Sequence, residues 1–166
     1  MTAALTVDIT IADPEWTTML PNAEDVVRET ASAAWSGVPE AAKGSAEISI
    51  LLADDDTVRD LNREHRGKDQ PTNVLSFAIG EADGLGEAPV MLGDVVLASG
   101  VVLREASAQG KPVAAHLRHL VVHGVLHLLG YDHETDLDAE SMESLEVEIL
   151  GNLAVPNPYL YRGAAE

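Results

Sequence analysis

Short segments in which apolar and polar residues alternate are typical of half-buried β-strands. Residues 5–11, LTVDITI, show this pattern and are rich in the β-branched residues that fit a pleated sheet. Three more short apolar segments, bounded by turn residues, predict further strands. The predicted strands are residues 5–11, 47–52, 74–77 and 93–98.

Apolar residues at helical spacing predict helices between and after these strands. Asn22 and the acidic triplet at 54–56 are suitable N-caps, and Gly67 follows the helix that the triplet begins. We expect the many glutamates of the last helix to be solvated and Gly151 to end it. The predicted helices are approximately residues 22–36, 54–66, 101–109, 113–129 and 138–150, with an exposed loop at 81–89.

The length of 166 residues suits a single domain, 1–166, with its own core. Cysteine is absent, which excludes disulfides and thiolate ligands and is compatible with a reducing compartment. The sequence shows neither a signal peptide nor an apolar segment long enough to span a bilayer. We therefore expect a soluble cytoplasmic protein without a membrane partner; the sequence leaves its oligomeric state open.

The chain carries 28 acidic and 10 basic residues, a net charge of −18, so its overall field repels phosphates. Four basic residues nevertheless fall within ten positions, namely Arg59, Arg63, Arg66 and Lys68. A local positive cleft on an acidic body is compatible with this distribution. The chain has only two Trp, three Tyr and one Phe, which does not support a base-stacking surface of the kind found in single-strand-binding proteins.

The strongest chemical signal is HGVLHLLGYDH at residues 123–133. Histidines four residues apart lie on one face of a helix, so the imidazoles of His123 and His127 can reach one ion. Gly130 is suited to end the helix, and His133 then returns toward the same point. Three neutral imidazoles with a fourth position open to water suit zinc, which predicts one Zn²⁺ per chain.

His119 lies on the same helix stripe, but it is about 12 Å from His127 at roughly 1.5 Å rise per residue. One zinc ion with Zn–N distances of about 2.0–2.1 Å cannot hold both, which favours His133 as the third ligand. The spacing also matches the ligand skeleton of metzincin proteases, which carry a glutamate base after the first histidine. Gly124 occupies that position, so the usual proteolytic base is missing.

A second segment, RGKDQPTNVLSF at residues 66–77, joins a polar turn to a predicted strand. Beside a metal site, a guanidinium that can grip an anion is a candidate site residue, and Arg66 is the best placed. Together the two segments resemble the YbeY family of single-strand-specific endoribonucleases, which act in ribosomal RNA maturation. The similarity covers about residues 47–159 and includes GD at 93–94, MESLE at 142–146 and NPY at 157–159.

The resemblance implies Zn²⁺ on His123, His127 and His133, with Arg66 as the catalytic cation. It also implies an α+β fold in which a mixed four-stranded sheet packs against about five helices, with a zincin-like metal helix. One departure from the pattern is His65, where we expect an aromatic residue before the arginine.

The function implied by the resemblance is processing of the 3′ end of small-subunit ribosomal RNA, together with ribosome quality control. The implied partners are single-stranded RNA, ribosomal RNA and the ribosome. RNA carries its own 2′-hydroxyl nucleophile, and a metal-bound water is already acidified, so phosphodiester cleavage does not require the glutamate that Gly124 replaces. The sequence leaves open which of the two nucleophiles operates. Two alternatives remain open: a zinc-dependent peptidase-like hydrolase with an unrecognised base, and a metal-stabilised ribosome-assembly factor with little catalysis of its own.

Overall fold

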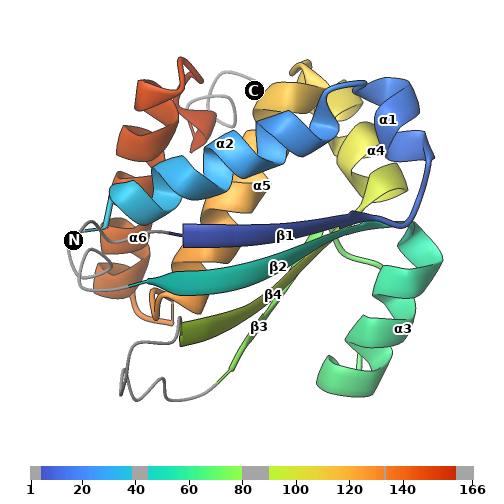
Figure 1. The fold of residues 1–166 in the computed structure, drawn as a ribbon, viewed down its shortest axis with the longest axis horizontal. Coiled ribbons are helices and arrows are strands. Elements are labelled where there is room, and N and C mark those ends of the chain that lie inside the picture. Colours follow the sequence, from blue (N-terminus) through green and yellow to red (C-terminus); the bar gives the residue numbers. More distant parts are fainter. Residues whose placement is uncertain (1–4, 39–44, 80–89, 133, 160–166) are drawn as a thin grey trace.

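The computed structural model describes residues 5–38, 45–79, 90–132 and 134–159, and within them it contains one four-stranded sheet and six helices (Figure 1). The strands are β1 (Leu5–Ile11), β2 (Ala46–Ala53), β3 (Val74–Ala78) and β4 (Val90–Ala98). The helices are α1 (Glu15–Met19), α2 (Ala23–Ser36), α3 (Asp55–Arg66), α4 (Ser99–Gln109), α5 (Val113–Leu128) and α6 (Asp136–Asn152). In the described ranges, no helix is long and apolar enough to cross a membrane.

The sheet has the strand order β1-β2-β4-β3. β1, β2 and β4 are parallel, whereas β3 pairs antiparallel with β4 along one edge. Helices connect the parallel strands, as parallel pairing requires a long crossover. The prediction of an α+β fold with a mixed four-stranded sheet is therefore confirmed, with one more helix than the approximate five expected.

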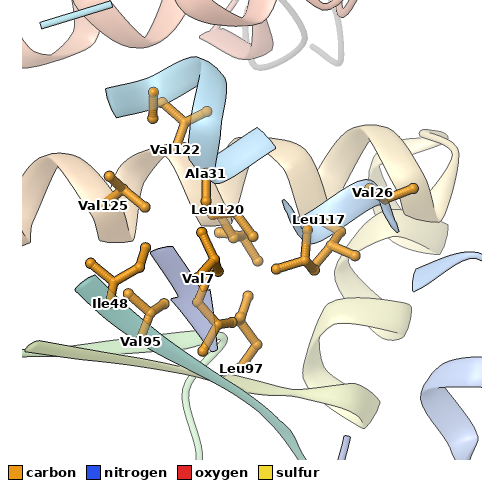
Figure 2. Packing of buried hydrophobic residues seen from close by; sticks show 14 of the residues in the cluster. Val7, Val26, Ala31, Ile48, Val95, Leu97, Leu117, Leu120, Val122 and Val125 are labelled. Atoms are coloured by element: carbon orange, nitrogen blue, oxygen red, sulfur yellow. The ribbon is translucent and has the colours of Figure 1, made fainter. Parts of the chain in front are cut away.

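The two faces of the sheet are covered differently. α2 and α5 pack on one face, and α3 packs on the other beside β3 and β4 (Figure 1). Figure 2 shows Ile48, Val95 and Leu97 of the sheet lying against residues of α5 such as Leu117 and Val125. Because successive side chains of a strand point to opposite faces, the residues between them face α3 or solvent.

Most predicted elements are found within three residues of their expected ends. At the start of α3, the Asp54 carboxylate accepts a hydrogen bond from the Thr57 amide at 2.8 Å, which lowers the pKa of Asp54 and confirms the predicted cap. The short helix α1 was not predicted; it buries Trp16 completely. Gly151 does not end α6, which continues to Asn152. The predicted loop at 81–89 lies outside the described residues.

Candidate metal centre

α5 presents three histidines along one stripe, while much of the rest of the helix is buried against α2 and the sheet. The Nε2 atoms of His123 and His127 lie 3.2 Å apart. His119 lies one turn earlier, and its Nε2 is 3.1 Å from the Oε1 atom of Glu146. The i, i+4 pair that the sequence singled out therefore points two ring nitrogens at one another, whereas the earlier histidine is directed to a carboxylate.

Glu146 of α6 connects these imidazoles and is completely buried. Its Oε2 atom is 2.7 Å from the Nδ1 atom of His123, and its Oε1 atom also accepts a hydrogen bond from the Tyr159 hydroxyl. Burial by itself raises the pKa of Glu146, but hydrogen bonds from the two imidazoles and the phenol outweigh this effect and lower the pKa to about 2. The ionised carboxylate favours a proton on Nδ1 of His123, so the lone pair lies on Nε2, the nitrogen that faces His127.

This arrangement fits a tetrahedral zinc site on two counts. Two nitrogens at zinc-ligand distance from a common tetrahedral ion are about 3.3 Å apart, close to the separation of the His123 and His127 nitrogens. In zinc sites, the ring nitrogen of a histidine that does not bind the metal usually donates a hydrogen bond to a carboxylate or carbonyl. The Nδ1 atom of His123 has such a partner in Glu146. Within the described part of the chain, no three His, Cys, Asp or Glu side chains form a metal-binding group. The third predicted ligand, His133, lies outside the described residues.

Gly124 allows α5 to lie close against the sheet. A Cβ atom at this position would be 2.8 Å from Cγ1 of Val95 on β4, and 3.2 Å from the Ser76 hydroxyl on β3. A glutamate side chain therefore has no room beside His123 unless the helix moves away from the sheet. The close packing of α5 against the sheet therefore requires glycine at the position where metzincin proteases carry their glutamate base.

A cavity of about 450 Å³ opens in front of the histidines. Its lining brings together Arg66 from the end of α3 with His119, His123 and His127 of α5, 53 or more positions later in the chain. Asn73 also lines this cavity, and its amide donates to the Glu105 carboxylate at 2.9 Å. The structure therefore places the predicted arginine and the predicted metal helix around one space.

Two of the four clustered cations that predicted a positive cleft are neutralised by carboxylates. Arg59 forms an ion pair with Asp69 at 2.8 Å, and Arg63 pairs with Asp60 at 3.1 Å. Arg66, in contrast, is exposed and has no carboxylate partner among the described residues. Its charge remains available to an anion in the cavity.

Two contributors to the site were missed by the sequence analysis, Glu146 and Tyr159. The expectation that the glutamates of the last helix are solvated is wrong for Glu146, which lies on the buried stripe with Met142 and Ile149. This i, i+4, i+7 spacing was a readable signal, because a carboxylate on an apolar stripe needs a buried partner. Tyr159 follows the last helix, and no local pattern connects it to α5.

In comparisons with known proteins, the matching family model and similar curated proteins carry the same description. The family model described as "Endoribonuclease YbeY" matches residues 10–154. A protein of that name from Paramagnetospirillum magneticum is 49% identical, covering 96% of this chain and 98% of the relative. Another, from Rhodopseudomonas palustris, is 51% identical over 83% of this chain and 73% of the relative.

Among solved structures, the solution structure of TM1509 from Thermotoga maritima matches with a TM-score of 0.53 at 24% identity, covering 90% of this chain and 92% of that chain. At this identity the likeness supports the fold alone. The family match and the two curated relatives extend over both α5 and the segment that contains Arg66. The chain belongs to the endoribonuclease YbeY family.

Proposed function

We propose that this protein is a zinc-dependent endoribonuclease that cleaves single-stranded RNA in the cavity between α3 and α5. The observation that carries the proposal is the pair of imidazole nitrogens, His123 Nε2 and His127 Nε2, held 3.2 Å apart beside the same cavity that Arg66 lines. His133 is the proposed third ligand. Family membership supports the RNA substrate, since the matching relatives are named endoribonucleases.

Each residue has a proposed role that follows from its surroundings. His123 and His127 hold the ion, and Glu146 keeps His123 in the tautomer that can ligate. When bound, zinc supplies Lewis acidity for attack on a phosphodiester. The Arg66 guanidinium binds the phosphate and stabilises the negative charge that develops on it during cleavage. Because this charge has no partner in the described structure, no ion pair has to break before an anion binds.

The proposed substrate is ribosomal RNA, processed at the 3′ end of the small-subunit RNA and during ribosome quality control. The ribosome is therefore the proposed partner and the cytoplasm the proposed compartment. The absence of cysteine is compatible with that compartment. The close packing at Gly124 argues against the peptidase alternative, because it leaves no room for the glutamate base of that chemistry.

A cleavage assay with measured metal content tests the proposal. The purified full chain is stripped with chelator, reloaded with zinc and given single-stranded RNA, duplex RNA and casein. We expect zinc-dependent cleavage of the single-stranded RNA only, and His123→Ala should lose both zinc and cleavage. Cleavage of casein would favour the peptidase alternative. Full zinc occupancy without any cleavage would favour the ribosome-assembly factor.

A further inference from the structure

A second, larger cavity lies on the other face of the sheet. Its volume is about 810 Å³, and it is lined by residues of α3 and of all four strands. Its lining includes His65 and Arg66 of α3, Phe77 and Ala78 of β3, and the carboxylates Asp8 and Asp94. Among the described residues that line this groove, none is a histidine of α5.

The groove contains two flat rings in contact. The ring centroids of His65 and Phe77 are 4.9 Å apart, with an angle of 53° between the ring planes. His65 is exposed and Phe77 is partly exposed, so the pair offers ring surface to the groove. Aromatic and imidazole rings are the side chains on which unstacked bases of single-stranded RNA stack. Although the sequence has few aromatic residues, the fold brings these two rings together.

The groove adjoins the cavity in front of the histidines. Arg66 and Ala78 line both spaces, and His65 precedes Arg66 directly in the chain. On β3, Ser76 faces the catalytic cavity, while the next residue, Phe77, faces the groove. The ring pair therefore lies next to the residue that is proposed to bind the phosphate.

The charges of the groove favour a base over the phosphate backbone. Asp8 and Asp94 are exposed carboxylates in its lining, and neither has a resolved cationic partner among the described residues. They repel phosphates, whereas a neutral base can lie against the rings and the apolar side chains of Leu51 and Leu61. The phosphate backbone of an RNA is thus expected to stay at the edge of the groove, near Arg66.

We propose that His65 and Phe77 form a stacking platform for one nucleobase of the RNA substrate, next to the phosphate bound by Arg66. The inference rests on the proposed function and adds a substrate-binding subsite to it. His65 is a binding residue in this scheme and takes no part in bond cleavage. Its contribution is therefore expected in affinity and KM rather than in kcat.

Binding of a non-cleavable RNA tests the platform. The probe is a fluorescent single-stranded 2′-O-methyl oligonucleotide, with a set of copies that each lack the base at one position. Affinities are measured by anisotropy on the zinc-loaded full chain for wild type, His65→Ala and His65→Tyr. Glu64→Ala is the matched control, since Glu64 is an exposed neighbour that does not line the groove.

Loss of one base stack is expected to weaken binding roughly 5- to 150-fold. The affinity of the wild-type protein should fall by this factor when one particular base of the RNA is removed. His65→Ala should bind the intact RNA as weakly and be insensitive to removal of that base, while His65→Tyr restores the sensitivity. The slope of affinity against salt should be unchanged in His65→Ala, because no phosphate contact is lost.

Wild type that tolerates removal of every base, or His65→Ala that discriminates as wild type does, would overturn the platform and leave the groove to a partner of other chemistry. Thermal melts of the variants identify loss of fold, and the wild-type probe series decides the matter independently of them. Cleavage of the unmodified RNA is scored separately. RNA cleavage without base dependence rejects the platform alone, whereas base-dependent binding without cleavage rejects the proposed function alone.

Discussion

Replacing Glu146 by glutamine changes the chemistry around His123 while keeping the shape of the side chain. In the native protein, two carboxylate oxygens accept from two imidazoles, those of His119 and His123. Glutamine offers one carbonyl oxygen and one NH₂ group, so one imidazole loses its acceptor or changes its tautomer. If His123 changes, its Nε2 carries a proton and cannot bind a metal.

The expected magnitude follows from the contact that is lost. The His123 Nδ1 atom lies 2.7 Å from a buried, ionised carboxylate, and a hydrogen bond to a charged group contributes about 1.5–3 kcal/mol. Loss of such an outer partner weakens metal binding by about 10- to 100-fold, equivalent to roughly 1.4–2.7 kcal/mol. The two ranges overlap, so we expect Glu146→Gln to bind zinc about 10- to 100-fold more weakly than wild type.

The zinc affinity is measured by competition with a chromophoric chelator at neutral pH. Glu140→Gln is the control, because Glu140 is an exposed residue of the same helix and the substitution removes the same charge. Equal zinc affinity in Glu146→Gln and wild type would refute the assignment of Glu146 as the partner that positions His123. A metal-free variant that melts far below metal-free wild type would instead show that Glu146 mainly supports the packing of α5 against α6.

His127→Ala should lose stoichiometric zinc in elemental analysis, whereas His119→Ala should keep it because its Nε2 faces Glu146; the reverse result would mean that the wrong histidines were chosen. Arg66→Ala should cleave single-stranded RNA roughly 10- to 1000-fold more slowly in single-turnover assays, with unfolding free energy changed by less than about 0.5 kcal/mol. Arg66→Lys should recover part of the rate, and a wild-type rate in Arg66→Ala would exclude the catalytic role. Gly124→Ala should lower the free energy of unfolding by about 1–3 kcal/mol in urea melts, because the new methyl group lies 2.8 Å from Val95; unchanged stability would show that α5 can shift away from β4.

The local features of this protein could be predicted from the order of its residues alone. Strand alternation, helical spacing and caps located β1 to β4 and five of the six described helices, since these signals depend on neighbours within a few residues. The same local geometry brought His123 and His127 to one point, because residues four apart share a helix face whatever surrounds the helix. The short α1 escaped because its five residues are too few to establish a period.

The surroundings of those histidines, in contrast, could not be predicted, because they depend on contacts between residues far apart in the chain. Glu146 is 23 positions from His123, and Tyr159 is 40 positions from His119, so their contacts depend on how α6 and the following segment pack against α5. The alignment of Arg66 with the metal helix and the contact between His65 and Phe77 likewise require β3 to pair with β4. The spacing of apolar residues along a helix or strand predicts which face of that element is apolar, but it does not predict which other element covers that face. Which elements contact each other depends on the packing of the whole core, and this packing brings the buried Glu146 carboxylate to the imidazoles of α5.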